Sequence, residues 1–407
     1  MSGNPVKKIL YVENGIGYGG AIICLRHLVR HLDRNRFKPL VVTGRTGPQY
    51  REIAQEADWR HVSDRYIDVV GMRRRLEQST WPQRIPGLTG LLKQLLARAD
   101  DVFNFLPFFL HLLWVAWRFK ADLIHVNNEP LCNRAALLVG KLLGIPTVCH
   151  VRGDPGDSRL TKWTYTLPTH FISVSHWVAK IMREKVQVPP EKISVIYDGI
   201  ALESLNLKAD GNDFRRQHHI PVNAYAVGLV GLLISWKGQA LFLDAAKLLH
   251  DKIPGLKMVI VGGTPDDCVA YEAMLRQRVI QEQLEDIIIF TGHVTQMEQV
   301  YNGLDVVVSA STSPEPLGTV VIECMAMGRP LIGPNHGGAA EMMEHGKTGL
   351  LFTPKDAASL ATEIETFYRD KQLSLQLGHN AREHALATFA ISSHTDKIQT
   401  LYDSILQ

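Results

Sequence analysis

Short apolar runs alternate with longer stretches of helical periodicity along the first half of the chain. Strand-like apolar runs occupy positions 7–12, 37–43, 122–126, 146–150, 170–175 and 193–197. The segments between them, such as AIICLRHLVRHL and NRAALLVGKLLG, repeat apolar residues with the helical period. Strands that are apolar along their length and alternate with helices are typical of a parallel sheet covered on both faces.

The same alternation starts again after a polar, irregular stretch at residues 198–222. The second series of strand-like runs lies at 225–231, 256–263, 286–292, 304–310, 330–333 and 349–352. We therefore predict an α/β protein with two doubly wound, Rossmann-like domains, at residues 1–205 and 206–385, facing across a cleft. Residues 386–407 are predicted to form a C-terminal helix that packs back on the first domain. Such sheets bind ligands at the carboxyl ends of their strands, so we expect the site in that cleft.

One region, residues 64–120, breaks this rhythm because it holds no clear strand. It contains Arg73, Arg74 and Arg75 and the aromatic run 103–119. That run is short for a membrane-spanning helix, polar residues and a proline interrupt it, and a strand follows closely, so no transmembrane helix is predicted. Two interpretations stay open: a core helix on the first sheet, or an aromatic helix that docks on a membrane surface.

Composition is that of a globular protein in a reducing compartment. The 407 residues are 45% hydrophobic and 21% charged, which excludes a disordered or fibrous chain. The five cysteines are an odd number without CxxC spacing, so neither a disulfide framework nor a structural zinc site is expected. The N-terminus runs directly into the first strand without a signal-peptide core, which predicts a cytoplasmic location.

Charge is distributed unevenly between the two halves. Residues 1–200 carry 28 Lys and Arg against 17 Asp and Glu, a net charge of +11, whereas the remainder carries 16 against 24, a net charge of −8. This asymmetry suggests different partners for the two domains. The basic half suits a membrane surface, a nucleic acid or an anionic substrate.

The sharpest chemical signal is the segment SPEPLGTVVIECMAMGRPLIG at residues 313–333. Glu315 lies in a loop after a strand, and Gly318 and Thr319 begin an apolar helix that contains Glu323. The N–H groups of a helix N-terminus bind phosphates, and a neighbouring carboxylate accepts hydrogen bonds from sugar hydroxyls. A similar junction at 230–239 places Lys237 where it can pair with phosphate. Taken singly, each of these side chains is better explained as an ordinary surface residue.

A glycine-rich turn follows the first strand. Gly15, Gly17 and Gly20 satisfy G-x-G-x-x-G, the fingerprint of dinucleotide-binding folds. The second strand ends near Arg45 without the acid that would hold an NAD ribose, but Arg45 would suit a 2′-phosphate, so an NADP site stays open. A turn that lets the backbone approach a sugar or phosphate fits equally well.

A fourth signal, HVRGDP, ends another predicted strand. His150 and Arg152 share one face of it, and His150 could contact a substrate hydroxyl or be a structural histidine. His125 is better explained as structural. The sequence has no HExxH, no strand-flanked DxD and no His/Cys cluster, so no metal site is expected.

Together these residues resemble glycosyltransferase family 4, whose members are retaining GT-B enzymes that use nucleotide-diphosphate sugars. The likeness covers nearly the whole chain and is strongest over residues 225–355. It rests on Glu315 and Glu323 in an E-x7-E arrangement, Lys237 and Gly238, Gly19 and Gly20, and the segment GGAAEMMEHGKTGLLF at 337–352.

The resemblance implies a role for each matching residue. Three of them are implied to be catalytic: Glu315 on the donor-sugar hydroxyls, Lys237 on the diphosphate, and His150 near the reaction centre. Glu323 would hold the ribose hydroxyls. The other implied donor-binding residues are Gly19, Gly20, Arg152, Leu317, Gly318 and Thr319.

Two departures from the family pattern affect the charge and shape of the site. Leu232 stands where the family often has Arg, so one diphosphate cation is missing or comes from elsewhere, with Arg152 as a candidate. Leu317 replaces a common aromatic. Because both carboxylates remain, the resemblance still implies an active enzyme. Without a metal, Lys237 and the helix N-terminus would have to balance the leaving diphosphate.

The predicted function is metal-independent, retaining transfer of a sugar from a nucleotide-diphosphate sugar to a hydroxyl of a saccharide or lipid-linked acceptor, as in cell-envelope polysaccharide synthesis. No cofactor and no nucleic acid are expected. The partners would be the nucleotide sugar, the acceptor and an anionic membrane surface, with the protein peripheral on its inner face. The alternatives are an NADP-dependent oxidoreductase, a non-catalytic membrane-surface scaffold and a GT-B epimerase.

Overall fold

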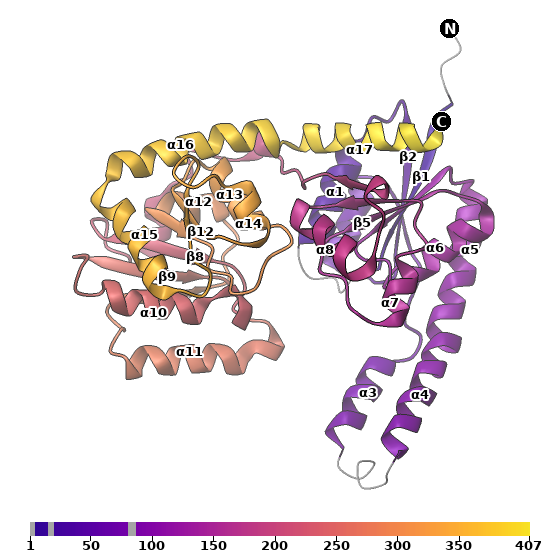
Figure 1. Cartoon of the computed structure of the whole chain (residues 1–407), viewed down its shortest axis with the longest axis horizontal. Coiled ribbons are helices and arrows are strands. Elements are labelled where there is room, and N and C mark those ends of the chain that lie inside the picture. The colour runs from indigo at the N-terminus through magenta and orange to yellow at the C-terminus, as the bar shows by residue number, and fades with distance from the viewer. Residues whose placement is uncertain (1–4, 15–19, 80–86) are drawn as a thin grey trace. The chain divides into compact units, whose positions relative to one another are not determined.

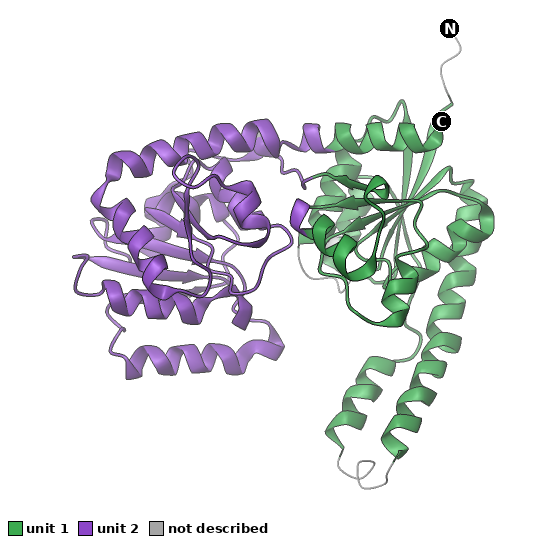
Figure 2. Cartoon of the chain, viewed as in Figure 1, with its two compact units in different colours: residues 1–174, 178–196, 395–407 green, residues 175–177, 197–394 purple. Residues whose placement is uncertain are grey.

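The computed structural model describes residues 5–14, 20–79 and 87–407 of the chain. They form two compact units, which Figure 2 colours separately. Unit 1 contains the chain up to residue 174, residues 178–196 and residues 395–407, and unit 2 contains residues 175–177 and 197–394. The main crossings between the units lie at 196/197 and 394/395, whereas the sequence pattern placed its divisions at 205/206 and 385/386.

Unit 1 is built on a parallel sheet whose seven described strands follow the order β3-β2-β1-β4-β5-β6-β7. Its inner strands are buried on both faces, because helices cover the sheet from both sides (Figure 1). The strands are β1 (Lys7–Glu13), β2 (Phe37–Thr43), β3 (Asp58–His61), β4 (Leu123–Asn127), β5 (Thr147–Val151), β6 (His170–Ser173) and β7 (Ile193–Val195).

The sequence analysis missed one of these strands, β3. Its four residues, DWRH, lie at the edge of the sheet and are mostly exposed, so they lack the apolar run that marks a buried strand. Parallel pairing with β2 holds the strand in place. The Trp59 indole N–H also donates to the Thr43 hydroxyl at 3.0 Å.

The helices of unit 1 that lie on the sheet turn an apolar face to it. Helix α1 does so with Ile22, Leu25, Leu28 and Val29, all buried. The helices and short helical turns are α1 (Gly20–His31), α2 (Pro48–Arg51), η1 (Glu52–Gln55), α3 (Val69–Gln78), α4 (Leu88–Asp100), η3 (Asp101–Phe105), α5 (Leu106–Phe119), α6 (Arg134–Leu143), α7 (Arg159–Thr164), α8 (His176–Val186) and η4 (Pro190–Lys192).

Helices α4 and α5 form one continuous helix of 32 residues, joined by the π-helical turn η3. By length and composition this helix could cross a membrane, with a mean hydropathy of 1.4 in its most apolar window. The aromatic run 103–119 is thus the C-terminal part of a longer helix than the sequence pattern indicated, because the helix begins before the aromatic residues do. Helix α5 buries four side chains in unit 1, whereas no described residue of α4 is buried. The α3–α4 pair extends away from the sheet (Figure 1).

Unit 2 repeats the architecture with a parallel sheet whose six described strands follow the order β10-β9-β8-β11-β12-β13. Both predicted doubly wound domains are thus present. The strands are β8 (Tyr225–Val230), β9 (Leu256–Val261), β10 (Ile288–Gly292), β11 (Val306–Val308), β12 (Leu331–Pro334) and β13 (Leu350–Phe352).

The helical elements of unit 2 alternate with its strands and enclose two apolar clusters, one on each side of the sheet. They are η5 (Leu202–Ser204), α9 (Gly211–Gln217), η6 (Ser235–Lys237), α10 (Gln239–Leu249), η7 (Asp266–Cys268), α11 (Val269–Gln281), α12 (Met297–Gly303), α13 (Thr319–Ala326), α14 (Gly337–Met342), α15 (Ala357–Arg369) and α16 (Lys371–Thr388).

The last helix, α17 (Ile391–Leu406), belongs to unit 1 from residue 395 onward. Its Ile398 and Tyr402 are buried in the core of that unit. The Tyr402 hydroxyl lies 2.6 Å from His125 Nδ1 and donates to the Tyr11 hydroxyl at 3.1 Å. The C-terminus therefore helps to hold the centre of the first sheet.

Candidate functional site

The predicted site residues of unit 2 lie after the carboxyl ends of two adjacent strands, β8 and β11, and the loop after the next strand, β12, packs on them. Strands β8, β11 and β12 are neighbours in the sheet, and the winding direction reverses between β8 and β11. In doubly wound sheets this switch point is where ligands bind.

Lys237 lies in the turn η6 between β8 and α10. The next residue, Gly238, has a φ of 83°, and a Cβ there would lie 1.9 Å from the Ala310 carbonyl oxygen. A glycine is needed, because the turn packs directly on the segment after β11. The Lys237 ammonium donates to Glu315 Oε2 at 2.7 Å and lies 4.7 Å from the centre of the Trp236 ring. The cation is thereby held over the strand ends.

Glu315 is held through both carboxylate oxygens. Oε2 accepts from Lys237, and Oε1 accepts from the Ser311 hydroxyl. Its side chain is only 11% exposed. The start of α14 supports this loop closely: the Gly338 N–H donates to the Glu315 carbonyl at 2.8 Å, and a Cβ at Gly337 or Gly338 would come within 2.8 Å of the loop backbone. The carboxylate position is therefore fixed by backbone packing from two loops.

Helix α13 begins directly after this loop, with Gly318 as its N-cap. No side chain among the described residues caps it, so the first N–H groups are available to a ligand. Leu317 and Thr319 are half-buried on either side. The helix dipole adds partial positive charge at this point, which suits a phosphate.

Glu323 lies on the second turn of α13. Its Oε2 accepts a 2.6 Å hydrogen bond from the hydroxyl of the buried Tyr301 on α12. Burial raises the pKa of Glu323, and the Tyr301 hydrogen bond partly opposes that rise. This half-buried carboxylate has one oxygen engaged and can accept hydrogen bonds from a ribose through the other oxygen.

Sequence reasoning did not find Trp236, Ser311 or Tyr301. Each supports a predicted residue, yet none has a motif of its own, and Tyr301 is distant in sequence from Glu323. Another such residue is His336, whose Nε2 lies 2.9 Å from the Ser311 carbonyl. These contacts depend on which loops meet above the sheet.

Leu232, at the position where the family often has Arg, is 47% exposed. Its carbonyl accepts a hydrogen bond from the buried Gln239 side chain at 2.9 Å. The residue shapes the loop and brings no charge to the site.

The remaining predicted residues lie in unit 1. His150, on β5, is fully buried, and its ring packs edge-on against His125. Arg152 follows the strand, with Nη2 3.3 Å from His150 Nδ1 and Nε donating to Asn127 Oδ1 at 3.0 Å. The two residues do share one face, as the alternation indicated. Their contacts with a sugar and a diphosphate stay predictions.

The glycine-rich turn falls mostly outside the described residues. Gly15, Gly17 and Gly19 lie there, whereas Gly20 is the first residue of α1. Next to the turn, at the switch point of the first sheet, both carboxylate oxygens of Glu13 accept from the Asn128 side chain at 2.7 and 2.8 Å.

The described residues include no group of three or more His, Cys, Asp or Glu side chains arranged to hold a metal ion. The positive charge that they place at the strand ends of unit 2 comes from Lys237 and from the N-terminus of α13.

Two family models match consecutive parts of the chain. Glycosyl transferases group 1 matches residues 210–384, and Glycosyltransferase Family 4 matches residues 18–204. The chain belongs to these glycosyltransferases. The resemblance to family 4 and the predicted enzyme class are thereby confirmed, and the oxidoreductase and scaffold alternatives are set aside.

Individual relatives of this glycosyltransferase are distant. N-acetyl-alpha-D-glucosaminyl L-malate synthase of Bacillus anthracis is 24% identical, over 75% of this chain and 82% of its own. The capsular polysaccharide biosynthesis glycosyltransferase CapM of Staphylococcus aureus is 25% identical, over 52% of this chain and 54% of its own. The crystal structure of Anabaena HepE in complex with UDP matches with a TM-score of 0.79 and 23% identity, covering 98% of this chain and 100% of that one. The predicted GT-B fold is confirmed.

Proposed function

We propose that this glycosyltransferase moves a sugar from a nucleoside-diphosphate donor to an acceptor hydroxyl, with retention of the anomeric configuration and without a metal ion. The observation that carries the proposal is the Lys237–Glu315 pair beside the N-terminus of α13. It supplies a cation and backbone donors for a diphosphate next to a carboxylate for sugar hydroxyls. Glu323, further along the helix, would hold the ribose.

In the proposed reaction, the bond from C1 of the sugar to the diphosphate oxygen breaks, and the bond from C1 to the acceptor oxygen forms on the same face. The acceptor proton passes to an oxygen of the departing diphosphate. Lys237 and the helix N-terminus stabilise the charge that develops on that leaving group. The protein otherwise contributes positioning, through Glu315 and Glu323.

A UDP sugar is the first donor to test, since HepE has been crystallised with UDP. A thermal-shift screen identifies the nucleotide. A ligand at a free concentration 100 times its Kd raises the free energy of unfolding by about 2.7 kcal/mol, which shifts Tm measurably. We expect a UDP or GDP compound to raise Tm. A protein that no nucleoside diphosphate or sugar nucleotide stabilises would contradict the proposal.

The stereochemistry and the metal requirement are tested with that donor. NMR coupling constants of the product should show the anomeric configuration of the donor, and turnover should survive EDTA. Inversion would refute the retaining mechanism. Loss of turnover in chelator, with recovery on adding manganese or magnesium, would refute metal independence.

We also propose that unit 1 binds the acceptor, a saccharide or lipid-linked saccharide, at an anionic membrane surface. The long helix formed by α4, η3 and α5 exposes large apolar side chains that, apart from the adjacent pair Val102 and Phe103, recur every three, four or seven positions, as on one helix face. They are Leu91, Leu95, Val102, Phe103, Leu106, Leu110, Trp114 and Trp117, each 45% to 65% exposed.

Basic residues accompany this apolar face. Arg73, Arg74 and Arg75 are exposed on the neighbouring helix α3, and Arg118 and Lys120 are exposed at the far end of α5. Apolar and aromatic residues that enter the interface, together with Lys and Arg, are typical of helices on anionic lipid. A role in assembling cell-envelope polysaccharide would follow from such a location, in line with the name of the CapM relative.

Co-sedimentation with vesicles tests this location. The protein should bind phosphatidylglycerol vesicles at low salt and neutral phosphatidylcholine vesicles weakly. Changing Arg73, Arg74 and Arg75 to Ser should make the free energy of vesicle binding less favourable by roughly 3 kcal/mol, at about 1 kcal/mol for each charge. Leu95→Ser on α4 should also weaken it. The control is Leu375→Ser on α16, which is 61% exposed in unit 2. No binding at low salt would contradict the docking.

A further inference from the structure

Unit 1 contains a cavity that none of the predicted catalytic or donor-binding residues lines, although Arg45, considered above for a 2′-phosphate, is part of its wall. It has a volume of about 210 Å³ and lies beyond the carboxyl ends of β1, β2 and β3, where doubly wound sheets bind ligands. Pockets for drug-sized ligands measure about 300 to 1,000 Å³, so this one suits a single small ring.

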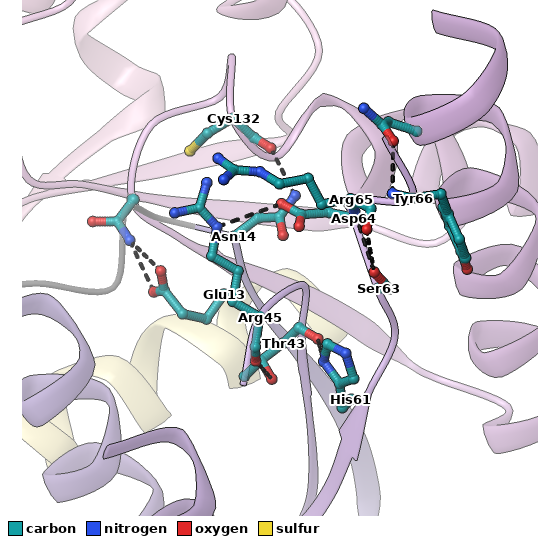
Figure 3. A network of polar contacts seen from close by, with 12 residues as sticks. Glu13, Asn14, Thr43, Arg45, His61, Ser63, Asp64, Arg65, Tyr66 and Cys132 are labelled. Carbon is teal, nitrogen blue, oxygen red and sulfur yellow. Dashed lines mark hydrogen bonds and ion pairs between the residues drawn. The ribbon is translucent and has the colours of Figure 1, made fainter. Parts of the chain in front are cut away.

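Two side-chain oxygens in this cavity are buried without a donor among the described residues. They are Oδ1 of Asn14, just after β1, and Oδ1 of Asp64, after β3. Gly44 lies between them, and a Cβ there would come within 1.8 Å of Asn14 Oδ1 and 2.9 Å of Asp64 Cγ. The absence of a side chain at Gly44 thus leaves room for both acceptors. Figure 3 shows Asn14, Arg45 and Asp64 in the same network of polar contacts. A buried acceptor without a donor is costly, which points to a ligand that donates.

Donors line the same cavity. Arg45 Nε lies 3.9 Å from Asp64 Oδ2, too far for a hydrogen bond, and Arg65 and Arg134 also line the wall. Burial raises the pKa of Asp64, while Arg45 and Arg65 act in the opposite direction. The cavity therefore offers guanidinium N–H groups beside acceptor oxygens.

The opposite wall is apolar and aromatic. Phe105 and Phe108 come from the η3 turn and α5, and the Arg134 guanidinium lies 4.6 Å from the centre of the Phe105 ring. A wall of this kind accepts the C–H face of a ring whose edge carries hydroxyls.

Hydrogen bonds within the protein hold this wall in place in the absence of a ligand. The buried Asn104, in the π-helical turn, accepts from the Tyr66 and Ile67 N–H groups at 2.7 and 2.9 Å and donates to the Ile67 carbonyl at 3.0 Å and to Asp100 at 2.8 Å. These bonds fix the loop after β3, and hence Asp64, relative to α5. Single π-helical turns inside helices are frequent at functional sites.

We propose that this cavity binds one neutral sugar unit of the acceptor, with hydroxyls donating to Asp64 and Asn14 and accepting from Arg45. The inference rests on the proposed function, since it assigns the acceptor of that reaction. A neutral sugar is favoured over a phosphate, because the two acceptor oxygens that lack a donor need hydroxyl hydrogens, which a phosphate dianion does not offer. Asp64 and Asp100 would also repel its negative charge.

Saturation-transfer NMR on the UDP-saturated full chain tests the proposal. The probes are the methyl glycosides of glucose, galactose, mannose and N-acetylglucosamine. At least one should give a signal, and Asp64→Asn or Asn14→Ala should reduce it at least tenfold. The control is Asp58→Asn, at the other end of β3 and outside the cavity, which should leave the signal unchanged.

Two further readouts separate the outcomes. Calorimetry with UDP should give the same Kd for Asp64→Asn as for the unaltered chain. If the unaltered chain does not bind UDP, the proposed donor is wrong, and the proposal for this cavity is not affected. The Tm of Asp64→Asn should be unchanged or higher, since a buried, partly unsatisfied carboxylate is removed. Normal UDP binding with no glycoside signal, or a signal that survives both substitutions, would overturn the proposal.

Discussion

The polar side chains of the site in unit 2 have hydrogen-bond partners within the protein, whereas two of those in the cavity of unit 1 each have an oxygen without one among the described residues. In unit 2, Lys237 pairs with Glu315, and Tyr301 pairs with Glu323, so each charge is satisfied by the protein. In unit 1, Asp64 and Asn14 each bury an oxygen that no described residue serves. A ligand in unit 2 would therefore meet side chains that already have a protein partner, together with the uncapped N–H groups of α13, whereas a ligand in unit 1 would supply the donors that Asn14 and Asp64 lack. The first arrangement suits a highly charged ligand, and the second suits hydroxyl groups.

The largest effect is expected from removing the cation of unit 2. Lys237→Ala should lower kcat about a hundredfold, because the leaving diphosphate loses its charged partner and Glu315 is left without a cation. Steady-state kinetics at saturating donor measure this. Lys252→Ala, an exposed lysine beyond the end of α10, is the control. A kcat within threefold of the unaltered value would show that Lys237 does not stabilise the leaving group.

A pair of glycine substitutions contrasts how rigidly the two regions are built. Gly238→Ala should destabilise unit 2 by roughly 3 kcal/mol, since its Cβ would meet a backbone carbonyl at a positive φ. Gly44→Ala should cost only about 1 kcal/mol, because the Cβ meets side chains that can move. Thermal unfolding measures both. Equal costs would mean that the two regions are equally rigid.

Removing Glu323, the proposed hydrogen-bond acceptor for the ribose, should weaken donor binding and leave the cavity in unit 1 unchanged. Glu323→Ala should weaken UDP binding by about 1.5–3 kcal/mol per hydrogen bond lost, as measured by calorimetry. Glu363→Ala is a matched control, because burial also raises the pKa of Glu363, on α15. If both variants bind UDP equally, Glu323 does not contact the nucleotide.

The smallest effect concerns pH. Burial raises the pKa of Glu323, so its carboxylate is lost on acidification at a higher pH than for an exposed Glu, and UDP binding should weaken as the pH falls through that pKa. The same raised pKa makes the contribution of Glu323 to unfolding free energy fall as the pH rises toward it. In Tyr301→Phe the carboxylate loses a donor, so the midpoint of UDP binding should move to higher pH. An unmoved midpoint would show that another group governs the profile.

The sequence by itself predicted the two sheets and the core of the proposed donor site. Strands of a covered parallel sheet must be apolar on both faces, so runs such as 225–231 stand out without any knowledge of their neighbours. Glu315 and Lys237 could be found for a related reason. Each follows a strand and precedes a helix, and in a doubly wound sheet that local position already places a residue at the ligand-binding edge.

Three features of unit 1 were visible only in the tertiary structure: the edge strand, the long helix and the cavity. The edge strand β3 has no apolar run, and the helix from Leu88 to Phe119 extends beyond its aromatic half. The cavity brings together Asn14, Asp64 and Asn104, which belong to three separate segments with no shared motif. Hydrogen-bond partners that lie far apart in sequence depend on the path of the chain and on the register of strands. Local periodicity carries no information about either.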